Sequence, residues 1–157
     1  MIGITKSILE NDFPTVFKFE DLQKICPDDN IRYCQVSRAV KNKEIVRLAK
    51  GVFTLGDLFR RKPIDSEALS QLIDEKSYVS MMSALRNNNW IPETVYLCSC
   101  VTSAKSKYLK CGYFDLDYRN INQKDYSKGV RTVNYYGTPF LQATPLKAIA
   151  DYISWIG

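Results

Sequence analysis

The sequence predicts an α+β protein built from two small domains. Helical patterns and short β-rich runs alternate along all 157 residues, and the basic run Arg60-Arg61-Lys62-Pro63 interrupts them once. We therefore expect a first domain over residues 1–62 and a second over residues 63–157. The second should be a small mixed α/β domain with helices first, a mainly antiparallel sheet, and a closing helix.

The first domain opens with a weak helical stripe over residues 1–10, a β-like run over 16–19 and a short helix over 20–25. Residues 27–30 form a turn rich in N-capping side chains. A helix should follow, with Tyr33, Val36 and Val40 facing the core. Its outer face should carry the polar residues Gln35, Arg38, Lys41 and Asn42.

A β-hairpin is expected directly after this helix. Residues 45–48 and 52–55 are β-branched or apolar runs, and Lys50-Gly51 turns the chain between them. A helix followed by a basic hairpin is typical of a winged helix-turn-helix, whose helix enters the major groove of DNA. Gln35, Arg38, Lys41 and Asn42 would then contact bases and phosphates, and Arg47 and Lys50 would contact the backbone. The alternatives are a solvated helix face, and charges that protect an edge strand.

Charge distribution favours the nucleic-acid interpretation more than total charge does. The net charge is only +5, but nine Lys or Arg residues and only two acids lie between Arg32 and Lys62. No apolar run approaches the roughly 18 residues that a membrane helix needs, and no secretory signal is recognisable at the start of the chain. We expect a cytoplasmic protein with no membrane partner.

The second domain should begin with a helix from Ser66 and a further helix over Tyr78–Leu85. Thr144 and Pro145 are the N-cap and first residue of a closing helix. Four runs rich in β-formers lie between, at Val95–Thr102, Tyr113–Tyr118, Val130–Tyr135 and Pro139–Ala143.

Few residues suggest catalysis or metal binding. Histidine is absent, which excludes Ser-His and Cys-His nucleophiles, and the five cysteines include no Cys-x-x-Cys pair. Reduced, mostly buried thiols are expected, with no cofactor and no metal. Asp115 and Asp117 could hold Mg²⁺ in a small nuclease, although exposed positions on a half-buried strand explain them more simply. Lys147 is expected at the surface.

Several stretches taken in order resemble AbiEi-type antitoxins of type IV toxin–antitoxin systems. They are RLAKGVFTL in the hairpin, then SYVSMMSALRNNNWIPETVYLCSCVTS, GYFDLDYRNI and LQATPLKAIADYI. The resemblance covers roughly Glu20 to Ile153. Many members of that family continue past the last helix, so we expect either a short member or a piece of a longer protein.

The resemblance implies a DNA-binding antitoxin and autorepressor of an abortive-infection operon, acting against phage. It implies double-stranded operator DNA as a partner, with a dimer on DNA as one arrangement. It also implies a nucleotidyltransferase toxin as a functional partner that need not be bound in a stable complex. On this interpretation the chain is not an enzyme. The alternatives are an unrelated winged-helix regulator whose second domain senses a ligand or partner, and the Asp115/Asp117 nuclease.

Overall fold

The computed structural model describes residues 1–92, 97–111, 114–121, 128–135 and 138–157, and its chain divides into two compact units. Unit 1 is Met1–Asp65 and unit 2 is Ser66–Gly157, so the division falls shortly after the boundary expected at Lys62. Each unit has its own sheet, and together they form a mixed α+β structure in which most strand pairs are antiparallel.

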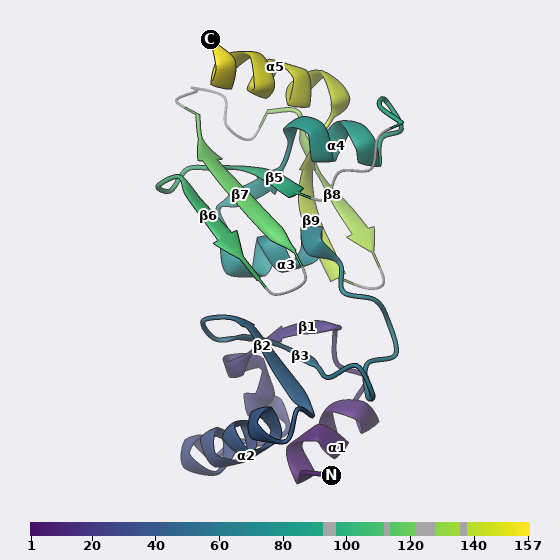
Figure 1. Ribbon diagram of the computed structural model, residues 1–157, viewed down its shortest axis with the longest axis vertical. Helices are drawn as coiled ribbons and strands as arrows, with labels where there is room; N and C mark the ends of the chain where they lie inside the picture. Colours follow the sequence, from purple (N-terminus) through teal and green to yellow (C-terminus); the bar gives the residue numbers. More distant parts are fainter. Residues whose placement is uncertain (93–96, 112–113, 122–127, 136–137) are drawn as a thin grey trace. The chain divides into compact units, whose positions relative to one another are not determined.

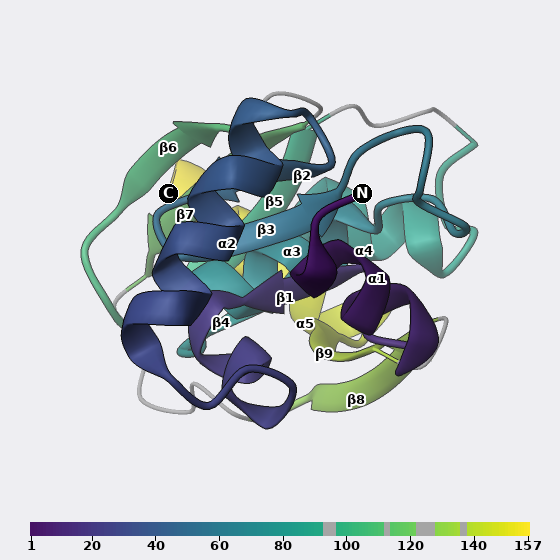
Figure 2. The ribbon, with the colours of Figure 1, turned by 90° about the horizontal axis from the view of Figure 1, so that it is seen from below.

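Unit 1 alternates helices and strands before ending in a hairpin (Figure 1). Its strands pair antiparallel in the order β1-β3-β2. Helices α1 and α2 lie on one side of this sheet (Figure 2). The elements are α1 (Gly3–Glu10), β1 (Val16–Lys18), the 3-10 helix η1 (Phe19–Lys24), α2 (Asp29–Lys41), β2 (Ile45–Ala49) and β3 (Val52–Leu55).

Apolar side chains from every element of unit 1 meet in one core. Full burial of a side chain of this size contributes about 1.5–3 kcal/mol, so the cluster is the main source of stability for such a small unit. Its buried members are Ile4, Ile8, Phe17, Leu22, Val36, Ala39, Ile45 and Phe53.

Unit 2 is built on a six-stranded sheet of order β6-β7-β5-β4-β9-β8. The pairs β4–β9 and β5–β7 are parallel and the other three are antiparallel, which confirms a mainly antiparallel sheet. Its elements are α3 (Ser66–Ile73), β4 (Ser77–Val79), α4 (Met81–Asn87), β5 (Leu97–Thr102), β6 (Lys107–Lys110), β7 (Asp115–Asn120), β8 (Val130–Tyr135), β9 (Thr138–Ala143) and α5 (Pro145–Ile156).

Helices cover both faces of this sheet. On one face the Tyr118 hydroxyl donates to the Ser70 carbonyl of α3 at 2.7 Å. On the other, the Arg119 guanidinium lies 4.5 Å from the centre of the Trp155 ring of α5, which packs beside α4. Neighbouring residues of β7 thus face opposite layers, as strand geometry requires. Among the described residues, no helix is both long and apolar enough to cross a bilayer.

The helix predicted over Tyr78–Leu85 is wrong in its first part, because residues 77–79 form strand β4. This strand is central in the sheet, where it pairs with β5 and β9. Its pairing outweighs the helical spacing of the local sequence. The chain then turns sharply at Met81, which adopts a left-handed φ of 54° before α4 continues.

The remaining strands follow the prediction more closely, and β8 has the predicted bounds. Strand β6 was not predicted, because Lys107–Lys110 carries lysine at both ends and only two apolar residues. Val95, Tyr96 and Tyr113, the first residues of two predicted strands, lie outside the described residues.

Helix α5 turns its charged residues toward the interior of unit 2. The buried Asp151 carboxylate accepts hydrogen bonds from the Tyr78 hydroxyl at 2.8 Å and the Ser80 hydroxyl at 2.7 Å. Lys147, one turn earlier, places Nζ 3.4 Å from the same carboxylate. The expectation that Lys147 is a surface residue was therefore wrong, because its charge is needed beside a buried carboxylate.

Candidate nucleic-acid interface

The start of α2 is fixed by two side chains. The Asp28 carboxylate accepts a hydrogen bond from the Ile31 amide at 3.0 Å and caps the helix. Arg32, only 5% exposed, donates to the carbonyls of Cys26 and Pro27 at 2.8 and 3.3 Å and pairs with Asp29. Both acids at this end of the helix are thus engaged in local structure.

Arg32 also sets the rotation of α2 about its axis. The helix buries Arg32, Val36 and Ala39, whereas Tyr33 is 67% and Val40 36% exposed. The prediction that Tyr33 and Val40 face the core was therefore wrong. The guanidinium lies 4.8 Å from the centre of the Phe19 ring, so an arginine occupies the place expected for an apolar residue.

This rotation decides which predicted residues reach solvent. Arg38, Lys41 and Asn42 are exposed, as expected. Gln35 is only half-buried because it lies beside the start of α1, with Oε1 3.4 Å from the position a Cβ on Gly3 would take. Its predicted position on the solvent-facing side is corrected to the α1–α2 contact. Tyr33, Cys34 and Ser37 are exposed on α2 instead.

The C-terminal end of α2 is closed by a left-handed residue, Lys43, with a φ of 60°. The Lys43 amide donates to the Val40 carbonyl at 3.1 Å, and the Glu44 amide to the Ala39 carbonyl at 2.8 Å. This is the Schellman arrangement, which usually places glycine where Lys43 stands. Gly56 packs so closely that a Cβ there would lie 2.2 Å from the Lys43 carbonyl oxygen.

The hairpin β2–β3 presents both of its predicted basic residues to solvent. Arg47 and Lys50 are exposed, and Arg47 Nε donates to the Ala49 carbonyl at 3.4 Å. Gly51 has a φ of 72°, which confirms that the turn uses its freedom to adopt positive φ. The Gly51 carbonyl accepts from the Phe19 amide at 2.9 Å, so the turn is tied to the start of η1.

The basic residues of unit 1 divide into structural and exposed groups. Arg32 is buried, and Arg60 is held by Asp57 and the Leu55 carbonyl at 2.8 and 3.2 Å. The other seven Lys and Arg residues between 32 and 62 are exposed, namely Arg38, Lys41, Lys43, Arg47, Lys50, Arg61 and Lys62. Glu44 is buried and accepts from the Ile2 amide at 2.9 Å, so it does not offset their charge at the surface.

The two carboxylates considered for a nuclease each have a neighbouring hydrogen-bond partner. Asp115 accepts from the Tyr108 hydroxyl at 2.8 Å, and Asp117 accepts from Arg119 Nε at 2.8 Å. Within the described ranges, no group of three or more Cys, Asp or Glu residues is arranged to hold a metal ion. The exposed basic surface of unit 1 is therefore the strongest candidate site.

Comparison with known proteins adds no further constraint. No model of a protein family matches the chain. Among curated proteins, none is similar enough to count as a relative.

Proposed function

We propose that this protein is a DNA-binding antitoxin and transcriptional autorepressor of a type IV toxin–antitoxin operon. On this proposal unit 1 is a winged helix-turn-helix in which η1 and α2 form the helix-turn-helix and β2–β3 is the wing. The observation that carries the DNA-binding part is the exposure of four basic residues of unit 1, Arg38 and Lys41 on α2 and Arg47 and Lys50 on the hairpin.

The order of elements in unit 1 supports this assignment. A helix, a short strand, two further helices and a hairpin form the arrangement in which winged helices place a recognition helix in the major groove. Arg38 can donate two hydrogen bonds to guanine, and hairpin cations can neutralise phosphates. The half-buried Gln35 is better suited to holding α1 against α2 than to reading a base.

The antitoxin part rests on the resemblance of the ordered sequence segments. One of these segments, TPLKAIADYI, lies largely in α5 and provides the Lys147–Asp151 pair, which is a feature of the packing of unit 2. The partners of this function are operator DNA and a nucleotidyltransferase toxin. The proposal assigns no catalytic role to the chain.

A gel-shift titration with the DNA upstream of the protein's own gene tests the DNA-binding part. Arg38→Ala should weaken operator binding by roughly 1–3 kcal/mol. The difference in affinity between operator DNA and random DNA should therefore become smaller. Lys50→Ala should weaken binding to both sequences about equally and reduce the salt dependence. Gln35→Ala is the matched control on the same helix. Because the half-buried Gln35 is not expected to read a base, this variant should distinguish operator from random DNA as the wild type does. If Arg38→Ala and Lys50→Ala both bind operator and random DNA with the affinity of the wild type, these residues do not form the DNA-binding site.

Co-expression with a nucleotidyltransferase encoded beside the gene tests the antitoxin part. The wild-type chain should restore growth, and Arg38→Ala should restore it equally, because we assign neutralisation to unit 2, which holds most of the segments that carry the resemblance. Failure of the wild type to restore growth, with DNA binding intact, would leave a regulator without antitoxin activity.

A further inference from the structure

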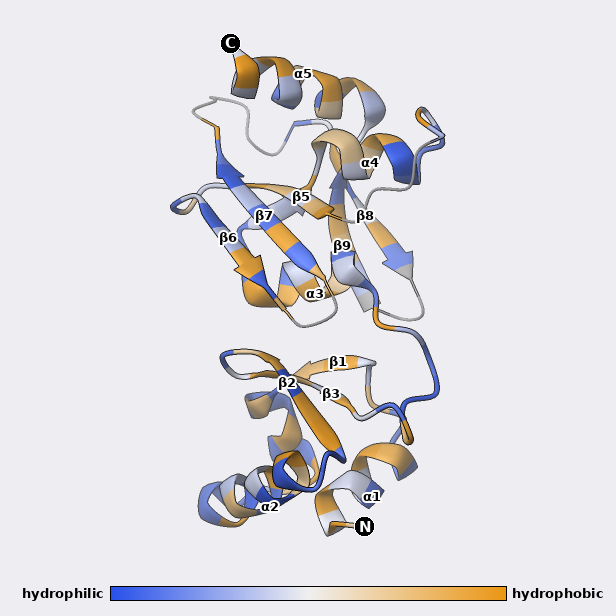
Figure 3. Ribbon diagram, viewed as in Figure 1, coloured by the Kyte–Doolittle hydropathy of each residue, from blue (hydrophilic) through white to orange (hydrophobic). Residues whose placement is uncertain are grey.

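The outer face of α2 can be located from the residues that the helix buries. Arg32, Val36 and Ala39 are buried and mark the side that packs in unit 1. Each residue of an α-helix is rotated by about 100° from the one before it, so one continuous stripe of positions lies on the opposite side. All five residues of this stripe are exposed, namely Asn30, Cys34, Ser37, Arg38 and Lys41. Figure 3 shows both hydrophilic and hydrophobic residues along α2, so exposure defines this face better than hydropathy does.

Two of the residues first expected to reach bases lie beside the stripe and not on it. Gln35 and Asn42 are rotated by roughly 65–90° from the buried side, which places both on one flank of the helix. Gln35 is half-buried there beside the start of α1. Asn42 is the C-cap, and its amide donates to the Arg38 carbonyl at 2.9 Å. The stripe, and not this flank, is therefore the part of α2 that would meet the floor of a groove.

The stripe changes in side-chain size and charge along its length. Its first three residues, Asn30, Cys34 and Ser37, are short and uncharged. Its last two, Arg38 and Lys41, are long and cationic. Recognition helices contact base edges with their N-terminal residues, and cations around them hold the phosphates. The order of residues on the stripe matches this division.

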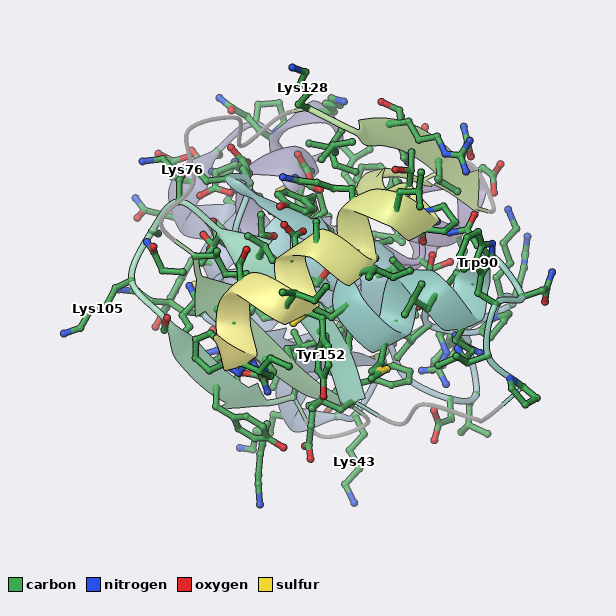
Figure 4. All side chains as sticks on the ribbon, turned by 90° about the horizontal axis from the view of Figure 1, so that it is seen from above. Lys43, Lys76, Trp90, Lys105, Lys128 and Tyr152 are labelled. Carbon is green, nitrogen blue, oxygen red and sulfur yellow. The ribbon has the colours of Figure 1, made fainter. Side chains whose placement is uncertain are left out.

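The charges beside the stripe also suit DNA on this face. Asp28 precedes the helix and caps it, and Asp29 pairs with Arg32 close to the buried side. Lys43 follows the helix, and Figure 4 shows its side chain pointing outward from the ribbon. The acids near α2 are thus held away from the stripe, whereas the cations at its C-terminal end are exposed.

We propose that Asn30, Cys34 and Ser37 determine the sequence specificity of this protein for double-stranded DNA. The inference rests on the proposed function, because it assigns bases within the groove that α2 would enter. A helix with its side chains is about as wide as the major groove, roughly 12 Å. Short side chains on the leading face therefore let the helix backbone come close to the base edges.

Each of the three residues favours a particular contact. Asn30 can form two hydrogen bonds with adenine, at N6 and N7. The thiol of Cys34 is small and weakly polar, which suits contact with the methyl group of thymine, and Ser37 can donate or accept at either kind of base pair. The distance along the helix from Asn30 to Ser37 is about 10 Å, the rise of about three base pairs. We therefore expect a site of A·T pairs beside a G·C pair that Arg38 reads.

Selection from a library of randomised DNA duplexes tests this assignment. The wild type should enrich one preferred sequence. Asn30→Ala should lose about tenfold in preference for an A·T pair at one position and keep the other preferences. Cys34→Ser should relax the preference for thymine at a neighbouring position. Asn42→Ala, which removes the same side chain as Asn30→Ala but from the flank, is the matched control and should keep every preference.

Enlarging the stripe tests the close approach of the helix. Ser37→Leu should weaken binding to the selected sequence by about tenfold or more, because the longer side chain holds the backbone away from the base edges. Asn42→Leu places the same side chain on the flank and should bind as the wild type does. Both positions are exposed, and circular dichroism with a thermal melt establishes that each variant is folded.

The outcomes separate this inference from the proposed function. If the wild type binds a preferred sequence and either Asn30→Ala or Ser37→Leu binds it equally well, the inference is overturned and the proposed function stands. Equal losses in the stripe variants and their flank controls would also overturn the inference, because the leading face of α2 would then lie elsewhere. A wild type that enriches no sequence overturns specific DNA binding itself, and this inference with it.

Discussion

Lys43 stands where the backbone of unit 1 favours glycine. Its φ of 60° is in the left-handed region, which costs a residue with a Cβ about 1–2 kcal/mol. The two amide hydrogen bonds that close α2 depend on this conformation. Gly56 packs directly against the Lys43 carbonyl, and this close approach leaves no room for a side chain at position 56.

We expect Lys43→Gly to stabilise the protein by about 1 kcal/mol, since it removes strain at the helix end. Urea unfolding of the wild type and the variant measures this difference. Gly56→Ala, which forces a Cβ against the Lys43 carbonyl, should be destabilising in the same assay. A destabilised Lys43→Gly variant would mean that the lysine side chain contributes more than its backbone costs.

Asp151 is the residue on which the packing of α5 depends most. Alanine at this position removes the carboxylate that accepts from the buried hydroxyls of Tyr78 and Ser80 and that lies beside the Lys147 ammonium. Removing one partner of such a buried pair costs about 3–5 kcal/mol. We expect Asp151→Ala to lower the free energy of unfolding by that amount in a denaturant titration.

Two substitutions act as controls for Asp151→Ala. Ser154→Ala, on the exposed side of the same helix, should change stability by less than about 0.5 kcal/mol. Asp151→Asn keeps an acceptor for the hydroxyls and should fall between the two. Equal stability of Asp151→Ala and Ser154→Ala would contradict the role given to the network.

At the scale of elements, local sequence signals predicted that a helix exists better than they predicted which of its faces is buried. The closing helix could be predicted from Thr144 and Pro145, and the Thr144 hydroxyl does cap it, accepting from the Lys147 amide at 3.4 Å. Its inverted orientation could not be predicted, because sequence periodicity assumes that the apolar face is buried. Asp151 finds its partners in Tyr78 and Ser80, about seventy residues away in the chain.

The candidate interface shows the same division. Exposure of Arg38, Lys41, Asn42, Arg47 and Lys50 followed from helix and hairpin periods. The half-buried position of Gln35 did not follow from these periods. It depends on the rotation of α2 that buries Arg32, whose partners are backbone carbonyls of the preceding turn. Strand β4 is three residues long, too short for alternation to be recognised, and is defined by its two neighbours in the sheet.

At the scale of the whole molecule, unit 2 buries several groups that resist losing their protons. The hydrogen bond with Cys100 and burial raise the pKa of the Cys98 thiol well above 9.0. Burial also raises the pKa values of the Cys111 thiol and of the Tyr118 hydroxyl above their ordinary 9.0 and 10.0. The folded protein therefore keeps protons that the unfolded chain releases at alkaline pH.

We expect the contribution of these groups to the free energy of unfolding to be constant below about pH 9 and to fall as the pH rises above that value. Each proton retained only by the folded state contributes a slope of about 1.4 kcal/mol per pH unit. Urea unfolding at several pH values between about 8 and about 10.5 measures how steeply the free energy of unfolding falls with pH. Cys98→Ala should make the slope shallower, and Cys34→Ala, at an exposed thiol, should leave it unchanged. A slope that Cys98→Ala does not alter would contradict this account.

The order of the six-stranded sheet has a consequence for aggregation. In the described part of unit 2 its edges are β6 and β8, and an exposed edge offers unpaired backbone groups to a strand of another chain. Strand β6 carries lysine at both ends, and Arg131 is exposed on β8. Two copies meeting edge to edge along β6 would align four lysines. Ordered growth of the sheet from chain to chain is thereby opposed by the repulsion between like charges.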